Sequence, residues 1–172
     1  MTGDVTWVHF YDPESKQESM QWHKKGGPPP KKFKVVPSAG KVMATIFWDS
    51  EGILLIDYKS KGATITGEYY AGILHQLREE IKKKRRGKLT KGVLVLHDNA
   101  PVHKAKIATA AVATCGFQEI VHPPYNPDLA PSDYYLFPNL KKDLRGRHFD
   151  SDEWLREISI LQTKTQNSFT MA

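Results

Sequence analysis

The apolar positions along the chain predict five β-strands. Runs rich in β-branched and aromatic residues lie at 1–11, 42–48, 53–58, 92–96 and 117–121. The first run is apolar on both faces, so we expect it to be a central strand. The run at 92–96 is apolar without alternation, so we expect it to be buried on both faces, as in a parallel sheet.

Helical spacing of apolar residues predicts three helices, at 66–86, 102–115 and 132–145. Thr66 is a suitable N-cap for the first, and Gly116 a suitable stop for the second. In the second helix the spacing places one side inward, formed by Ile107, Ala110, Ala111 and Thr114. The order β-β-β-α-β-α-β-α predicts an α/β fold, with a mixed five-stranded sheet flanked by helices.

The segment 12–40 interrupts this pattern with seven prolines and glycines between Pro13 and Pro37. From Trp22 to Lys41 there are six lysines and no acidic residue. A long irregular segment inside a compact domain is usually functional or disordered, and Trp22 and Phe33 favour a functional one because they could anchor it.

Composition narrows the class of protein. With 172 residues the chain is long enough for one domain, and no apolar run approaches the roughly 18 residues of a membrane span. A single cysteine excludes an internal disulfide and a cysteine zinc site. The net charge of +6 favours polyanionic partners. Cations concentrate at Lys24, Lys25, Lys31, Lys32, Lys34, Lys82, Lys83, Lys84, Arg85, Arg86, Lys141, Lys142 and Arg145.

Three aspartates lie where the predicted elements begin or end. Asp98 follows the buried strand, Asp4 lies near the start of the first strand, and Asp133 lies near the start of the last helix. Carboxylates brought together would repel one another, and hard divalent cations such as Mg²⁺ relieve that repulsion. From the residues alone, other readings stay open: Asp98 as a turn or capping residue, Asp133 as a helix N-terminal acid, and Asp4 as a surface acid.

Three motifs sharpen this picture. Thr2-Gly3-Asp4, His97-Asp98-Asn99-Ala100-Pro101 and the proline-rich block at 125–134 resemble signature blocks of the mariner-family DNA transposases. That family has three catalytic aspartates with 34 residues between the second and third, and 34 residues separate Asp98 from Asp133. Asp128 breaks this spacing, so we expect it to be structural. The resemblance covers roughly residues 2–152.

The resemblance implies an RNase H-like catalytic domain over 1–152 and a divergent, poorly ordered tail over 153–172. It implies that Asp4, Asp98 and Asp133 bind the metal: two Mg²⁺ ions per site with DNA bound, with Mn²⁺ as a substitute. His97 and Asn99 flank Asp98, and we expect them to position it. For His103 and His122 we expect structural hydrogen bonds. Segment 12–40 matches the place of the family's clamp loop, which reaches a second subunit.

The implied activity is metal-dependent DNA cleavage and strand transfer, in which transposon ends are cut and inserted at TA target sites. The implied setting is the nucleus, with DNA as partner, a homodimer in the DNA complex, and no membrane. We expect the family's N-terminal DNA-recognition region to be missing. The alternative is a domesticated or truncated descendant that binds DNA or protein without full transposition. A different RNase H-like nuclease, such as an integrase or ribonuclease, fits the 34-residue spacing and the proline block less well.

Overall fold

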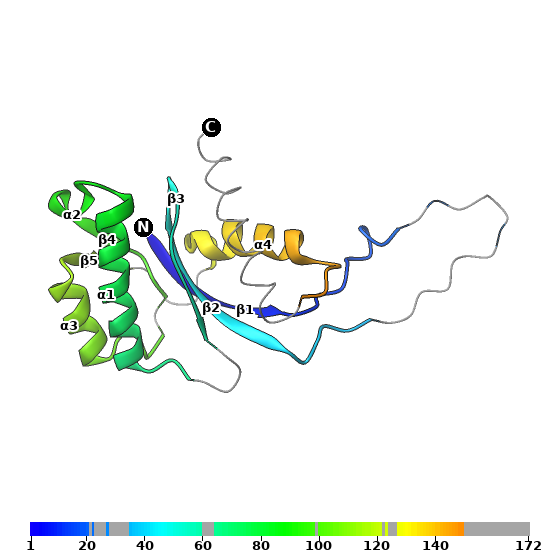
Figure 1. Cartoon of the computed structure of the whole chain (residues 1–172), viewed down its shortest axis with the longest axis horizontal. Helices are drawn as coiled ribbons and strands as arrows, with labels where there is room; N and C mark the ends of the chain where they lie inside the picture. The colour runs from blue at the N-terminus through cyan, green and yellow to red at the C-terminus, as the bar shows by residue number, and fades with distance from the viewer. Residues whose placement is uncertain are drawn as a thin grey trace.

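A central sheet organises the chain (Figure 1). The computed structural model describes residues 1–20, 22, 27, 35–59, 64–98, 100–121, 123 and 127–149. Three strands pair antiparallel in the order β1-β2-β3: β1 (Thr2–His9), β2 (Lys41–Asp49) and β3 (Gly52–Lys59). A second, parallel pair consists of β4 (Val93–Val95) and β5 (Phe117–Glu119). A parallel bridge between Thr2 and Leu96 links the two parts, so β1 lies between β2 and β4 as expected for a central strand.

The predicted helices are present, with shorter bounds. They are α1 (Gly67–Lys84), α3 (Lys106–Thr114) and α4 (Phe137–Leu144), and a short helix that the sequence did not predict, α2 (Lys88–Lys91), follows α1. Thr66 caps α1 by accepting a hydrogen bond from the Tyr69 amide. A 3₁₀ turn (Pro127–Leu129) and a π-helical turn (Ser132–Leu136) lead into α4. None of these helices combines the length and apolar character needed to cross a membrane.

Alternation along β2 creates a core on each face of the antiparallel sheet. Phe47 packs with α1 and α3 in one cluster of buried residues. Its neighbours Ile46 and Trp48 pack on the opposite face against α4. Because successive side chains of a strand point to opposite faces, one strand supplies both cores.

Two of the predicted packing faces are wrong. In β4, Val93 and Val95 are buried against the α1 side, but Leu94 on the other face is 52% exposed. The described α4 covers only the β1–β3 half of that face. In α3 the inward side consists of Ala108, Ala111, Val112 and Cys115. Ile107, placed inward by the sequence pattern, is 52% exposed.

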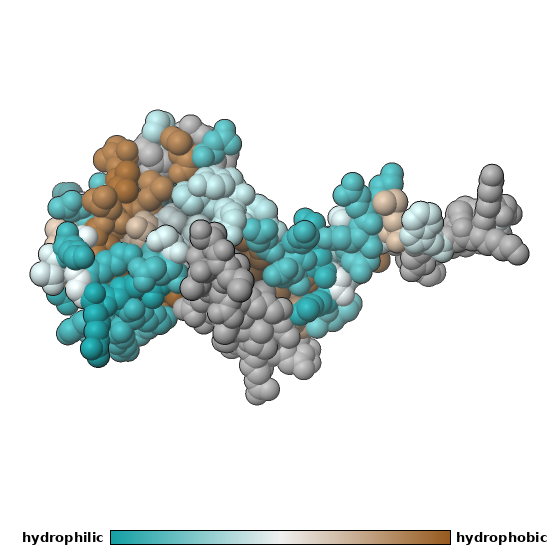
Figure 2. Space-filling model, turned by 90° about the horizontal axis from the view of Figure 1, so that it is seen from above, coloured by the Kyte–Doolittle hydropathy of each residue, from teal (hydrophilic) through white to brown (hydrophobic). Residues whose placement is uncertain are grey.

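The surface reflects this uneven cover. Apolar side chains gather at the end of the molecule away from the described flanks of segment 12–40, and hydrophilic ones border them (Figure 2). Those flanks, 12–20 and 35–40, lead away from the sheet (Figure 1). The domain boundary predicted at residue 152 and the tail at 153–172 lie outside the described residues, so both stay predictions.

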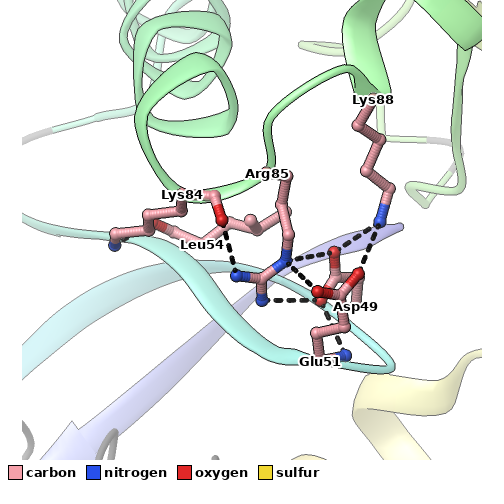
Figure 3. A network of polar contacts seen from close by, with 6 residues as sticks. All are labelled: Asp49, Glu51, Leu54, Lys84, Arg85 and Lys88. Carbon is pink, nitrogen blue, oxygen red and sulfur yellow. Dashed lines mark hydrogen bonds and ion pairs between the residues drawn. The ribbon is translucent and has the colours of Figure 1, made fainter.

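A buried ion cluster fastens the β2–β3 turn to the end of α1 (Figure 3). Asp49 is buried, and its carboxylate accepts hydrogen bonds from Arg85 Nη2 at 3.1 Å and from Lys88 Nζ at 2.6 Å. Burial alone would raise the pKa of Asp49, but the hydrogen bonds from Arg85 and Lys88 outweigh it and hold the pKa below its usual range. Lys84 adds a bond from its ammonium to the Leu54 carbonyl.

Gly3 allows a close approach between β1 and the core. A Cβ built on Gly3 would lie 2.3 Å from the Phe47 ring, which is fully buried. No real Cβ tolerates such a distance, and the ring has no free space in a packed core. The glycine of the Thr2-Gly3-Asp4 motif is therefore required by packing.

We predict that Gly3→Ala lowers the free energy of unfolding by about 1–3 kcal/mol, because the Phe47 ring must shift. Urea denaturation measures the change. Gly72→Ala is the matched control, since Gly72 lies on α1 with open space around its Cβ position. That variant should be stabilised by about 0.5–1 kcal/mol through helix propensity. Equal stability of Gly3→Ala and the wild type would refute the packing argument.

Candidate active site

The strand register places Asp4 and Asp98 on one face of the sheet. Asp4 pairs with Ile46, so it points to the face that carries α4. On β4, Leu94 points to the same side, and the alternation continued past the strand end puts Asp98 there as well. The backbone contact of Gly3 N with Leu96 O, at 2.8 Å, brings the two segments together.

Asp133 reaches this face through a buried anchor. Ser132 is fully buried, and its hydroxyl oxygen accepts a hydrogen bond from Trp48 Nε1 at 3.1 Å. Trp48 belongs to the α4-facing core, so the bond fixes the π-helical turn against β2. Asp133, the next residue, is exposed and is the second residue of this turn. The sequence gives no signal for a contact between residues so far apart.

The pKa of Asp4 is affected by the other two carboxylates. Burial raises the pKa of Asp4 to about 7, opposed by a hydrogen bond from the Val5 amide and increased further by the charges of Asp133 and Asp98. The Val5 bond, 2.7 Å to Oδ1, fixes one carboxylate oxygen. Three acids from distant parts of the chain therefore share one electrostatic environment.

Asp98 has a specific partner in His103. The Nδ1 atom of His103 lies 2.5 Å from Asp98 Oδ1 and 3.0 Å from the Asp98 backbone oxygen. The hydrogen bond from His103 lowers the pKa of Asp98 against the effect of its partial burial. His103, expected to be a structural histidine, is thus the imidazole that contacts this carboxylate.

His97 points to the opposite side. Its Nδ1 is hydrogen-bonded to the Tyr70 hydroxyl at 2.7 Å, and its ring stacks on His103 at 4.8 Å. Its Nε2 lies 3.1 Å from Glu119 Oε1, but the direction does not suit a hydrogen bond, so this contact is electrostatic. Burial, followed by the charge of His103, lowers the pKa of His97. Its link to Asp98 therefore runs through His103.

The donor set suits a hard divalent cation, because carboxylate oxygens are what Mg²⁺ and Mn²⁺ prefer. A bound cation would also relieve the repulsion that the charges of Asp133 and Asp98 exert on the Asp4 carboxylate. Among the residues that the structure describes, however, no three His, Cys, Asp or Glu side chains already surround one point as metal ligands. The aspartates are neighbours here rather than a closed coordination shell.

A groove of about 840 Å³ extends from Asp133 between β1 and α4. Its walls include residues 5–9 of β1 and three cations of the α4 region, Lys141, Lys142 and Arg145. Lys141 and Lys142 are exposed, and Arg145 lies 3.8 Å from Glu18. This arrangement places cations beside one of the three aspartates.

The basic residues 82–86 lie elsewhere. Tyr70 touches His97 near the N-terminal end of α1, and Arg85 follows fifteen residues later, roughly 22 Å along a helix. Arg85 is turned inward onto Asp49, with only 10% of its side chain exposed (Figure 3). Lys82, Lys83 and Lys84 pair with Glu79 or Glu80. Arg86 is exposed. This cluster is therefore remote from the carboxylates, and Arg85 is already engaged by the fold.

Several predicted residues fall outside the described part of the chain: Asn99, His122, Lys24, Lys25, Lys31, Lys32 and Lys34. Asp128 lies exposed in the 3₁₀ turn ahead of Asp133. The sequence reasoning missed Tyr70 and Ser132. Tyr70 lies on the helix face predicted to be core, and periodicity cannot show that its hydroxyl has a polar partner. Ser132 precedes Asp133, and its type and position alone do not predict a buried hydrogen bond.

A protein-family model described as "Transposase (partial DDE domain)" matches residues 12–91. That range lies between Asp4 and Asp98, so the match supports family membership and says nothing about the three aspartates.

Two curated relatives extend over most of the chain. The Mariner Mos1 transposase of Drosophila mauritiana is 32% identical over an alignment of length 163, which covers 91% of this chain and 46% of that protein. The human histone-lysine N-methyltransferase SETMAR is 31% identical over 154 residues, which are 89% of this chain and 22% of that protein. The chain thus spans less than half the length of either relative.

Solved structures agree with the sequence relatives. The Mos1 mariner paired end complex with Mn aligns with a TM-score of 0.85 at 30% identity, covering 98% of this chain and 49% of that one. The Mos1 catalytic domain aligns with a TM-score of 0.73 at 26% identity, covering 98% of this chain and 71% of that one. The predicted RNase H-like α/β fold is confirmed. Together with the site geometry, these similarities show that the chain belongs to the mariner transposase family and corresponds to its catalytic domain.

Proposed function

We propose that this chain supplies the catalytic domain for metal-dependent DNA cleavage and strand transfer, with Asp4, Asp98 and Asp133 as the metal ligands. The observation behind the proposal is that the strand register brings Asp4 and Asp98 out on one face of the sheet, where the charges of Asp133 and Asp98 add to the burial that raises the pKa of Asp4. Similarity to the Mos1 transposase, whose structures include a strand transfer complex and complexes with Mn and Mg, supports the same activity.

The roles of the residues follow from their chemistry. Asp4, Asp98 and Asp133 would hold the divalent cations, two per site when DNA is present, and these cations would supply activation of a water or a 3′-hydroxyl and stabilisation of the leaving oxygen. Asp4 is held by the Val5 amide and Asp98 by His103, so each presents a fixed carboxylate. Asp133 adds the third from the turn anchored by Ser132.

DNA is the proposed substrate, bound along the groove beside Asp133. Lys141, Lys142 and Arg145 would neutralise phosphates there, which supports affinity without reading sequence. We further propose TA target sites, a homodimer in the DNA complex with segment 12–40 as the clamp, and action in the nucleus. The Mos1 paired-end structures support the DNA partner at the family level.

A second candidate is a binding domain that retains the basic groove without catalysis. It is favoured by one observation: no three acidic, histidine or cysteine side chains within the described ranges already form a metal-binding group. Metal-dependent cleavage by the chain separates the two candidates.

We predict that Asp98→Asn reduces Mn²⁺-dependent nicking of supercoiled plasmid by at least about a hundredfold, because metal catalysis contributes several kcal/mol to the barrier. Circular dichroism and salt-dependent DNA binding should stay near those of the wild type. Asp128→Asn is the control, since Asp128 is an exposed aspartate of the proline-rich block that also contains Asp133, and this variant should nick normally. Full activity of Asp98→Asn would remove Asp98 from the catalytic set. An inactive wild type would favour the binding-domain candidate.

We predict that Asp4→Asn stabilises the fold at high pH. The pKa of Asp4 is raised from 3.8 to about 7, so the stability of the fold falls as the pH rises between these two values, and the loss is complete above 7. At pH 8 the free energy of unfolding should increase by about 1–3 kcal/mol relative to wild type, and near pH 4 the difference should vanish. Urea denaturation at both pH values measures this. Asp143→Asn, an exposed α4 substitution, should show no such pH-dependent gain. A loss of stability at pH 8 would contradict the raised pKa.

We predict that the double variant Lys141→Ala/Lys142→Ala weakens DNA binding and flattens its salt dependence. The slope of log K against log salt should fall by about 1.8, since each phosphate contact contributes about 0.9. Fluorescence anisotropy over a salt series measures the slope. Lys82→Ala/Lys83→Ala removes the same charge at the remote end of α1 and should change the slope by less. Equal effects of the two variants would show that DNA is not confined to the groove.

A further inference from the structure

A stack of buried rings lies directly behind Asp98. His103 has 5% of its side chain exposed. The centroid of its ring lies 4.2 Å from that of Tyr70 and 4.8 Å from that of His97, and the planes of the two imidazoles differ by 8°. The Tyr70 hydroxyl bonds His97 Nδ1, which joins the stack to α1. The rings leave His103 little freedom to turn, so the direction of its Nδ1 is set by the core.

The Nδ1 atom faces two oxygens of the same residue. It lies 3.0 Å from the backbone oxygen of Asp98 and 2.5 Å from its Oδ1. The backbone contact alone would satisfy a buried histidine. The second contact restrains a carboxylate that is 54% exposed and that, among the described residues, also accepts a hydrogen bond from the Ala100 amide at 3.3 Å.

We propose that His103 is a positioning residue for Asp98, which it holds through Oδ1 so that Oδ2 faces the space shared with Asp4 and Asp133. The proposal rests on the proposed metal-binding role of Asp98. A close polar contact with one oxygen of a ligating carboxylate, as between His103 Nδ1 and Asp98 Oδ1, restrains its orientation, and partners of this kind typically change metal affinity by 10–100-fold when removed. Tyr70 and His97 act one step further back, by fixing the plane of the His103 ring.

Titration of the whole chain with Mn²⁺, followed by the electron paramagnetic resonance of the free ion, tests this role. The variants are His103→Ala, which removes the donor, and His103→Asn, whose side-chain amide stands close to the position of Nδ1. Asp98→Asn identifies the binding that depends on Asp98. His75→Ala is the control, because His75 is a histidine whose Nδ1 contacts Cys115 Sγ at 3.5 Å, away from Asp98.

The expected result is an Mn²⁺ affinity about tenfold weaker in His103→Ala, within about threefold of wild type in His103→Asn, and unchanged in His75→Ala. A purely structural role would not make metal affinity follow the Nδ1 donor. If His103→Ala unfolds, His103→Gln replaces it, since its longer side chain cannot place a donor at Nδ1. Its affinity should then fall below that of His103→Asn.

Two results would overturn the proposal, and they differ. Mn²⁺ binding that is lost in Asp98→Asn but unchanged in the variants lacking the donor would reject the role of His103 and leave the metal site intact. Absence of binding in the wild type, or binding unaffected by Asp98→Asn, would reject the metal site itself and the role of His103 with it.

Discussion

The site depends on a short parallel contact between β1 and β4. Gly3 N bonds Leu96 O at 2.8 Å, and Leu96 N bonds the Met1 oxygen at 3.0 Å. The two segments are far apart in sequence, and in the described part of the chain this bridge at Thr2 and Leu96 is where β1 pairs with β4. Because the register is fixed there, Asp4 and Asp98 emerge side by side on one face. A shift by one residue would turn Asp4 to the other face.

The same arrangement concentrates negative charge where the fold cannot neutralise it. Asp49 shows the contrast, because Arg85 and Lys88 compensate its burial completely. Among the described groups that shift the pKa of Asp4, no lysine or arginine takes this part, and the charge of His103 lowers that pKa only weakly. Packing on both sides of the sheet holds the acids in place despite this cost. Uncompensated acids held by a stable frame are typical of functional sites.

Much of this was predictable from the sequence, and the exceptions have physical reasons. The five strands and three of the helices follow from hydrophobic periodicity, and the strand-end rule singles out Asp98 as a candidate, whereas the choice of Asp4 and Asp133 beside it came from the resemblance to the mariner family. The exposure of Leu94 does not, since periodicity cannot tell which face a later helix covers. Arg85 was grouped with the cations available to a polyanionic partner, because its partner Asp49 is distant in sequence. The contact of His103 with Asp98 depends on the turn between these residues and on the packing of His103 against Tyr70 and His97, which sequence spacing does not show.

The two cores on opposite faces of the sheet have separate origins. The α1 core draws mainly on residues 47–117, whereas the α4 core joins β1–β3 to residues 136–149. Asp4 and Asp98 are fixed by strand pairing, and Asp133 is fixed by the Trp48–Ser132 bond and the packing of α4. Proteins open in cooperative units, and here the three acids of the site are held by two different packed layers. Detachment of α4 would remove one carboxylate without breaking a strand pair, so the stability of a single helical layer governs how often all three acids are present together.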